Sequence, residues 1–533
     1  MKLTNYIAGI LLSVLTLTSC SDWLNLEPED GVIRQEFWKT KEHVKSAVIG
    51  CYMSAQTGVV ESMFLWGELR ADMIENGTSV NNNFSEVMDG EISAANSVVD
   101  WADFYNVINN CNTVLEFAPG VREIDGTFTE RQLNEYKAEV LTLRALMYFY
   151  LVRSFRDVPF VTEAYISDDQ DLYVGKTSGA IILDSLVADL QYAAVNAPSA
   201  YATNAENKSR ITRWTARALL ADIYLWQENY TACNNVLNEI IGSNRYSLMP
   251  VEQTKEYVVD GGVLIDSITI PSESDAERIF VETYVRGASP ESIFEFPFTS
   301  IKNNPFYSLM GPQVNQLRPK LDVVDEGIFP LPVYMAYPEA SDIRGSGFSY
   351  RAGVIWKYVG TSRTGAARAA TEYTAPWLVY KYSDVLLMKA EALTQIGLAT
   401  SGEVVSSYYR QALELLQQVR KARNAVETSD YKFDIENLDG KTLEKAILDE
   451  RAREFAYEGK RWYDVLRHAK RNNYEGNNLQ YLITLAINSA TPQKQQSLIA
   501  KYRDPNRNSH YWPIFVREIE TNKNLTQNEF YAN

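Results

Sequence analysis

The chain has 533 residues, of which 46% are hydrophobic and 22% charged, and its formal net charge is −17. A chain of this length and composition can bury a large core without disulfides or metals, and it is neither disordered throughout nor collagen-like. The acidic balance argues against nucleic-acid binding, which needs a basic face, and against electrostatic docking on anionic lipid. Aromatic residues are abundant, with 33 Tyr, 20 Phe and 10 Trp, whereas His occurs only three times.

The first twenty residues have the pattern of a secretory signal. A basic start at Lys2 is followed by an apolar run from Tyr6 to Leu17, which is too short to span a bilayer. The segment Leu17-Thr18-Ser19-Cys20 resembles a bacterial lipobox. We therefore expect residues 1–19 to be a signal peptide and Cys20 to be the lipidated first residue of the mature chain, held in the bilayer by its acyl chains. The alternative is a signal peptide that happens to contain a cysteine.

The remaining cysteines are Cys51, Cys111 and Cys233, each in a segment with periodic apolar residues. Three is an odd number and no CxxC pair is present, which argues against a disulfide framework and against zinc. We expect buried free thiols.

Helical periodicity begins near Thr40, which is placed to cap a helix that reaches about Gln56. A second helix is expected over 101–118, with Pro119 and Gly120 as its stop. A third is expected over 130–155, where Thr129 and Gln132 make a capping box. Further helices are expected near 178–196, 211–227, 229–242, 376–396, 402–424 and 442–470.

Two amphipathic helices over 216–241 meet at a very short turn, with the small residues Ala221 and Cys233 at contact positions. This arrangement resembles a degenerate tetratricopeptide (TPR) hairpin, and 383–424 offers a weaker second pair. Two unrelated helical hairpins would give the same periodicity. The predicted fold class is mainly α, with a TPR-like helix-pair scaffold and a loop-rich irregular subdomain.

Between about 245 and 375 helical periodicity disappears and Gly, Pro, Ser and aromatic residues increase. A non-helical stretch of this length is usually functional or a small subdomain. After the signal peptide we therefore expect an N-terminal helical part over 20–245, a loop-rich ligand-side region over 246–375 and a C-terminal helical part over 376–533.

Sequence motifs of catalysis are missing: the chain has no HExxH, GxSxG, GxxxxGK[ST] or GxGxxG. Two carboxylates could hydrolyse a glycoside, but among 68 acidic residues any pair is a weak signal. We expect a protein that is not an enzyme and has no cofactor. Structural calcium is left open, although no compact acidic loop predicts it.

The densest charge cluster lies over 449–467. If the helix continues through Gly459, its acids share one face and each has an arginine three residues away. The expected pairs are Glu450 with Arg453, Glu454 with Arg451, and Glu458 with Arg461. The cluster is either an acid site or a structural salt-bridge network flanked by core aromatics, and the second interpretation is favoured.

Polar and aromatic residues gather in two regions outside the clearest helices, 66–101 and 303–358. Aromatic faces cover the apolar face of a sugar ring, while Asp, Asn and Arg bond its hydroxyls. The alternative is that these side chains pack in the core. The candidate ligand-binding residues are Arg70, Asp72, Asn81, Trp101, Arg344, Arg351 and Trp356.

Several segments match one family when they are taken in order. They are the lipobox at Cys20 and residues 150–160, 216–230, 380–392, 450–467 and 512–528. Together they resemble the SusD/RagB family of bacterial outer-membrane nutrient-binding lipoproteins. Two positions depart from the family pattern: Arg156 stands where Gly is usual and Ser383 where Ala is usual.

The resemblance implies a helical fold with four TPR-like helix pairs, displayed at the outer-membrane surface. It implies a lipid-anchored protein that faces the cell exterior, binds a glycan and delivers it to a SusC-like TonB-dependent transporter. In the family the segment that resembles 450–467 is a signature independent of ligand, and Asp72 and Trp101 lie where members often place binding loops. Alternatives are a peptide ligand, a purely structural lid of the transporter, and a surface glycoside hydrolase.

Overall fold

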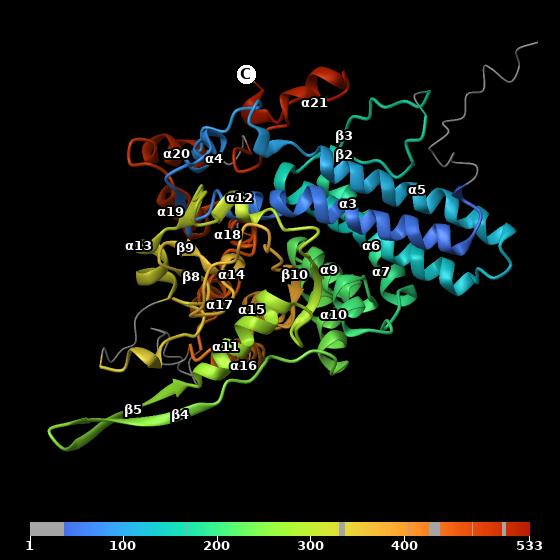
Figure 1. The fold of residues 1–533 in the computed structure, drawn as a ribbon. Helices are drawn as coiled ribbons and strands as arrows, with labels where there is room; N and C mark the ends of the chain where they lie inside the picture. Colours follow the sequence, from blue (N-terminus) through green and yellow to red (C-terminus); the bar gives the residue numbers. More distant parts are fainter. Residues whose placement is uncertain are drawn as a thin grey trace, which may run out of the picture.

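The computed structural model describes residues 37–167, 169–329, 336–402, 405–425, 438–471, 473–503 and 508–532 (Figure 1). The predicted signal peptide and Cys20 lie outside the described residues. The elements of the N-terminal part are α3 (Lys41–Glu68), β1 (Ile74–Asn76), α4 (Asn82–Met88), η1 (Ser97–Val99), α5 (Ala102–Ile124), α6 (Glu130–Phe155), β2 (Val158–Pro159), β3 (Lys176–Thr177), α7 (Gly179–Asn196), α8 (Asn204–Ser209), α9 (Arg213–Trp226) and α10 (Tyr230–Gly242).

Local capping signals place the first long helices. Thr40 is the N-cap of α3, and its side chain accepts a hydrogen bond from the His43 backbone N–H. The helix continues to Glu68, beyond the predicted end at Gln56, because its second half also buries an apolar face. The capping box of Thr129 and Gln132 is confirmed at the start of α6.

The predicted stop at Pro119 is wrong, because α5 continues to Ile124 with this proline inside it. Proline removes one backbone hydrogen bond from a helix. Ala118 and Val121 on either side of it are fully buried, so packing of the last turns holds the helix beyond the proline.

Helix pairs form the scaffold of the fold. Closely packed neighbours include α3 with α5, α5 with α6, α6 with α7, α9 with α10, and α15 (Tyr382–Ala399) with α16 (Val405–Ala422). Ala221 and Cys233 lie in the α9–α10 pair and are completely buried, as the TPR-like packing predicted. The fold is mainly α, with a TPR-like scaffold and a loop-rich remainder.

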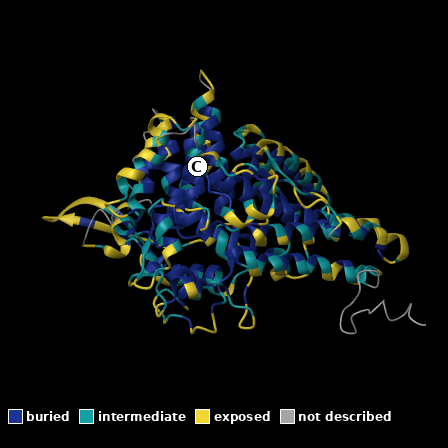
Figure 2. Ribbon diagram, turned by 90° about the horizontal axis from the view of Figure 1, so that it is seen from above, coloured by how far each residue is buried: buried dark blue, intermediate teal, exposed yellow. Residues whose placement is uncertain are grey.

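The region 246–375 consists of short elements joined by irregular chain. They are β4 (Gln253–Asp260), β5 (Val263–Pro271), α11 (Glu273–Phe280), η2 (Val281–Arg286), β6 (Ser292–Phe296), α12 (Phe306–Met310), β7 (Leu317–Pro319), α13 (Leu321–Val323), η3 (Val324–Ile328), η4 (Pro338–Ala340), β8 (Tyr350–Arg351), β9 (Val354–Ile355) and α14 (Trp356–Val359). The hairpin β4–β5 projects from the body and is largely exposed (Figures 1 and 2). The division at 245 and 375 stays a prediction.

The C-terminal part returns to helices. It contains β10 (Trp377–Lys381), α15, α16, α17 (Gly440–Glu454), α18 (Arg461–Lys470), α19 (Gly476–Ser489), α20 (Gln495–Tyr502), α21 (Val516–Thr521) and η6 (Glu529–Tyr531). Five antiparallel two-stranded sheets are assigned among the described residues: β1 with β7, β2 with β3, β4 with β5, β6 with β10, and β8 with β9.

A single helix over 442–470 is the second prediction that is wrong. α17 ends at Glu454 and α18 begins at Arg461. In the turn between them Tyr457 and Gly459 have φ values of 63° and 68°, which a right-handed helix does not contain. The turn is held because Tyr457 is completely buried and its N-terminal neighbours pack in the core.

One large hydrophobic cluster joins the N-terminal helices, the loop-rich region and α18, and a smaller one lies between α15, α16 and α17. Figure 2 shows this buried interior inside an exposed shell. Cys51, Cys111 and Cys233 are buried free thiols, as predicted. Within the described ranges, no helix is both long enough and apolar enough to cross a bilayer.

Candidate functional site

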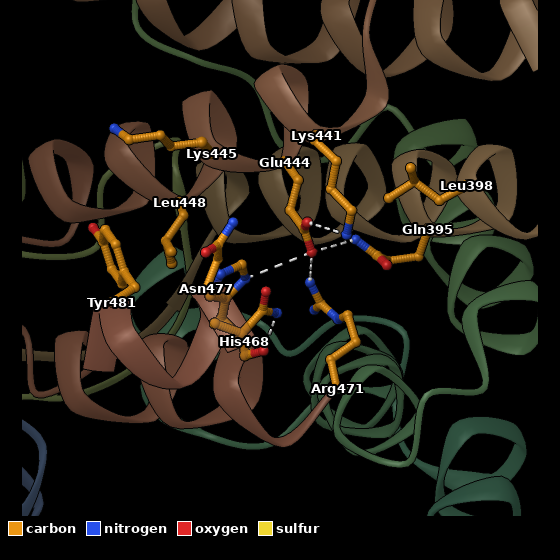
Figure 3. A pocket seen from close by; sticks show the side chains of 11 residues that line it. Gln395, Leu398, Lys441, Glu444, Lys445, Leu448, His468, Arg471, Asn477 and Tyr481 are labelled. Carbon is orange, nitrogen blue, oxygen red and sulfur yellow. Dashed lines mark hydrogen bonds and ion pairs between the residues drawn. The ribbon is translucent and has the colours of Figure 1, made fainter. Parts of the chain in front are cut away.

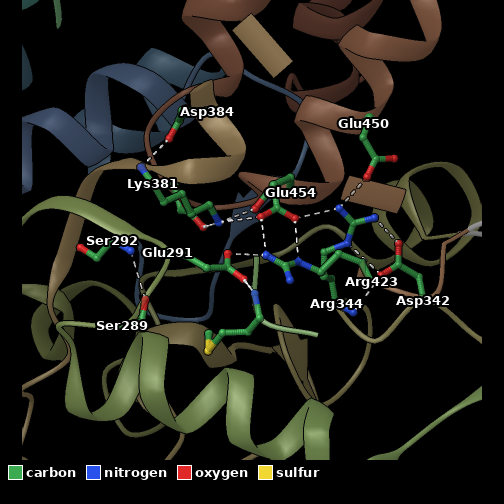
Figure 4. Close-up of polar contacts among 12 residues, drawn as sticks. Ser289, Glu291, Ser292, Asp342, Arg344, Lys381, Asp384, Arg423, Glu450 and Glu454 are labelled. Carbon is green, nitrogen blue, oxygen red and sulfur yellow. Dashed lines mark hydrogen bonds and ion pairs between the residues drawn. The ribbon is translucent and has the colours of Figure 1, made fainter. Parts of the chain in front are cut away.

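Three acids of the 449–467 cluster, Glu450, Glu454 and Glu458, belong to a buried charge network that joins α17 to the loop-rich region (Figure 4). Glu454 is 1% exposed and lies 2.9 Å from Arg344 Nη1, 3.1 Å from Arg423 Nη2 and 3.3 Å from Lys381 Nζ. Burial raises the pKa of Glu454, but the cations Arg423, Lys381 and Arg344 outweigh it and hold the pKa well below its usual range. The members of the network are Glu291, Asp342, Arg344, Lys357, Lys381, Arg423, Glu450, Glu454 and Glu458.

Glu458 completes the network at the turn after α17. Its Oε1 accepts hydrogen bonds from Lys357 Nζ at 2.8 Å, Lys381 Nζ at 2.9 Å and the Tyr284 hydroxyl at 2.8 Å. Its Oε2 lies 4.0 Å from Lys460 Nζ and has no hydrogen bond among the described residues. Because Glu458 is buried among cations of the protein itself, the cluster is structural, which confirms the favoured interpretation.

The expected arginine partners are corrected for two of the three acids. Only Arg453 pairs with its predicted partner among the described residues, 2.9 Å from Glu450. Arg451 pairs with Asp464 at 2.9 Å and Arg461 with Asp72 at 3.0 Å. The chain leaves the helix at Phe455, so Glu458 and Arg461 do not share a helical face. Arg451 is still within α17, but it pairs with Asp464 of α18 and not with Glu454.

Five of the seven predicted ligand-binding side chains are buried and packed against other protein groups. Arg344 lies in the buried charge network, and Asp72 holds Arg461. Arg70 stacks over Trp462 and Trp512, with its guanidinium carbon 4.3 and 4.0 Å from the ring centres.

The two predicted tryptophans are core residues as well. Trp101 is 1% exposed and packs edge-on against Phe155, with ring centres 4.9 Å apart. Trp356 is 6% exposed and lies under Arg351. In this structure these five side chains are buried and leave little surface for a ligand. Asn81 is exposed and Arg351 is half-buried, and for these two ligand contact stays a prediction.

Asn81 borders a cavity of about 430 Å³, which we call the Asn81 cavity. The residues around it come from the middle of α3, the start of α4, η1 and the start of α5. They are Thr57, Gly58, Glu61, Ser62, Leu65, Asn81, Phe84, Ser97, Val98, Asp100, Ala102 and Asp103. Asn81 is fixed as the N-cap of α4, because its side chain accepts from the Asn83 backbone N–H at 2.9 Å.

The Asn81 cavity is rich in hydrogen-bond acceptors. Among the described residues, Glu61 and Asp103 have neither a hydrogen-bond nor an ion-pair partner. Burial raises the pKa of Glu61, as expected for a carboxyl group without a cation beside it. Asp100 accepts from the Ala102 backbone N–H, and hydroxyl groups of Thr57, Ser62 and Ser97 complete the polar wall.

A second cavity, of about 610 Å³, lies between α15, α17, α18 and α19 and is called the Glu444 cavity (Figure 3). Its lining residues are Gln395, Leu398, Lys441, Glu444, Lys445, Leu448, His468, Arg471, Asn477, Asn478 and Tyr481. Its lining carries more cations than acids, in contrast to that of the Asn81 cavity. The sequence did not predict Glu61, Asp103 or the lining of the Glu444 cavity as site residues. Isolated polar residues on amphipathic helices give no local signal of a binding site.

Comparison with protein-family models gives two matches. The model described as "SusD family" matches residues 333–531, and the one described as "Starch-binding associating with outer membrane" matches residues 22–225. SusD-like protein P38 of Formosa agariphila is 26% identical over 98% of both chains, and SusD-like protein P25 of the same organism is 24% identical over 88% of this chain and 90% of its own.

Solved structures share the fold. A SusD superfamily protein from Bacteroides fragilis has a TM-score of 0.66 at 18% identity and covers 92% of this chain and 99% of its own. A protein described as a laminarin-binding SusD-like protein has a TM-score of 0.61 at 20% identity, with the same coverage. The family models, the relatives and the fold agree, and the chain is similar to proteins of the SusD/RagB family along most of its length.

Proposed function

We propose that this protein is a glycan-binding lipoprotein of the outer membrane, anchored through Cys20 and facing the cell exterior, that delivers its ligand to a SusC-like TonB-dependent transporter. It acts by binding and has no catalytic role. The family description of starch binding in association with the outer membrane supports this proposal, as does the lipobox. A structural relative described as carbohydrate binding points the same way.

The observation that carries the proposal is the set of unpaired acceptors in the Asn81 cavity. Neutral glycans present many hydroxyl donors, and carboxylates such as Glu61 and Asp103 accept them strongly. The cavity volume of about 430 Å³ lies within the usual range of small-ligand sites. Asn81 adds a polar side chain to the lining. A neutral glycan can donate hydrogen bonds to all these groups through its hydroxyls.

A peptide is the second candidate ligand, and the same two carboxylates favour it if the peptide is basic. A structural lid without a ligand of its own is the third. Binding experiments separate the three functions. A glycan-binding protein binds neutral oligosaccharides, a peptide-binding protein binds a basic peptide digest, and a structural lid binds neither.

The test is a calorimetric titration of residues 21–533 with oligosaccharides of laminarin and of starch. Replacing Glu61→Gln and Asp103→Asn together keeps the shape of the cavity and removes both charges. We expect at least about tenfold weaker binding, since each charged hydrogen bond contributes roughly 1.5–3 kcal/mol. The control is Glu123→Gln, an exposed acid near the other end of α5. Equal affinity in the double variant would exclude this cavity, and the absence of any glycan binding would exclude the proposed ligand class.

A further inference from the structure

The Glu444 cavity shares no lining residue with the Asn81 cavity and opens between different helices. One wall is formed by α17, whose lining residues are spaced three, one and three positions apart: Lys441, Glu444, Lys445 and Leu448. The last turn of α18 and the first turn of α19 form the wall that faces it (Figure 3).

Glu444 is the only carboxylate in the described lining, and it is already satisfied. It is 5% exposed and accepts hydrogen bonds from Gln395 Nε2 at 2.8 Å and Arg471 Nη1 at 2.7 Å. Lys441 Nζ lies 3.1 Å away and His468 Nδ1 lies 3.5 Å away. Burial raises the pKa of Glu444, but the donors His468 and Arg471 outweigh it and hold the pKa far below its usual range. The acid therefore positions the cations and leaves no free acceptor for a ligand hydroxyl.

The two lysines of the lining are exposed to solvent. Lys441 and Lys445 are 67% and 58% exposed, and each ammonium group carries three donors. Lys445 also pairs with Asp449, and Arg471 with Glu391, so these two neighbouring acids are engaged as well. The Arg471 side chain is 8% exposed, and its Nε has no hydrogen-bond acceptor among the described residues.

Two further features suit an anion that is attached to a sugar ring. α19 has 14 residues and no side-chain cap at Glu475, and Asn477 and Asn478 in its first turn line the cavity. The positive end of the helix dipole therefore lies at the cavity wall. Leu398, Leu448 and the ring of Tyr481 give the lining an apolar part, against which the apolar face of a sugar can pack.

We infer that the Glu444 cavity is a second ligand site, which takes an acidic sugar through its carboxylate or sulfate group. The anion is bound by Lys441, Lys445 and the start of α19. Arg471 fixes the position of Glu444 beneath the anion. The sugar ring packs against the apolar wall. This site goes beyond the proposed function and does not depend on the glycan cavity, because it selects for charge where the Asn81 cavity selects for hydroxyl groups.

The test titrates residues 21–533 with glucuronate, with glucose 6-sulfate and with neutral glucose. We expect saturable binding of at least one acid and none of glucose, with an affinity that falls as NaCl is raised, because the contact is between exposed charges. Binding of glucuronate indicates a carboxylate site, and binding of glucose 6-sulfate indicates a sulfate site.

The decisive variant replaces Lys441→Ala and Lys445→Ala together. Both side chains are exposed, so helix α17 retains its buried face, which circular dichroism checks. We expect the affinity for the acid to fall about tenfold or more. The matched control replaces Lys45→Ala and Lys255→Ala, two exposed lysines that line neither cavity. Absence of saturable binding, or equal affinity in the two double variants, would overturn the inference. Neutral-glycan binding is measured on the same variants and is expected to be unchanged, which keeps the two proposals separable.

Discussion

Arg461 donates two parallel hydrogen bonds to Asp72, from Nε to Oδ1 at 3.1 Å and from Nη2 to Oδ2 at 3.0 Å. The two residues are 389 positions apart, and both are almost fully buried. The pair joins the start of α18 to the chain that follows α3. Asp72, which the sequence suggested as a ligand contact, therefore links two distant parts of the fold.

Replacing Asp72→Ala is expected to lower the free energy of unfolding by about 3–5 kcal/mol, because it leaves the Arg461 guanidinium buried without its partner. Urea unfolding measures the loss. The matched control is Glu75→Ala in β1, whose partner Arg318 lies 2.9 Å away in a partly exposed pair. Such a pair contributes roughly 0–1 kcal/mol. Equal losses in the two variants would show that the Asp72 pair is not a buried structural contact.

Glu68 at the end of α3 is expected to make stability depend on pH. Burial raises the pKa of Glu68 to about 8, although the Gly459 backbone N–H donates to Oε1 at 2.8 Å. Because the pKa is higher in the folded state, the folded chain binds the extra proton, and stability falls as pH rises from about 4.3 to about 8.

Glu68→Gln removes this titration and keeps a neutral side chain of the same shape. We expect the variant to gain stability relative to the native chain between pH 5 and pH 8.5, as measured by urea unfolding at each pH. The exposed change Glu123→Gln is the control. The raised pKa would be contradicted if the two chains differed in free energy of unfolding by the same amount at every pH in this range.

Replacing two glycines of α3 by alanine is expected to change the free energy of unfolding in opposite directions. A Cβ at Gly67 would lie 1.9 Å from the carbonyl oxygen of Gly459, whereas a Cβ at Gly50 meets nothing within 4 Å. Gly67→Ala is therefore expected to cost about 1–3 kcal/mol or more, because the turn between α17 and α18 has to move. Gly50→Ala is expected to gain roughly 0.5–1 kcal/mol, because alanine loses less backbone entropy in a helix. The urea midpoints of both variants are compared, and the same sign for both would refute the close approach.

Local signals predicted the helices, and long-range contacts decided where the prediction failed. Thr129 and Gln132 are three residues apart, so their capping box could be recognised without any knowledge of the fold. The persistence of α5 beyond Pro119 depends on burial of Val121 against other helices. The turn at Tyr457 likewise depends on contacts that adjacent residues do not reveal.

The candidate site was predicted less well, for the same reason. Asn81 does border a cavity, but Glu61 and Asp103 lie on long helices where an acid is an ordinary surface residue. Arg344 is paired with Glu450, 106 positions away. A sequence pattern shows which side chains are able to bind a sugar, whereas the fold determines which of them are already bound to protein.

The most direct measurement of the central claim is affinity electrophoresis of residues 21–533 through gels that contain single polysaccharides, with a basic peptide digest titrated in parallel by calorimetry. The account predicts that at least one neutral polysaccharide retards the chain and that replacing Glu61→Gln and Asp103→Asn together strongly reduces the retardation. Migration unaffected by every polysaccharide, together with saturable binding of peptides, would contradict it.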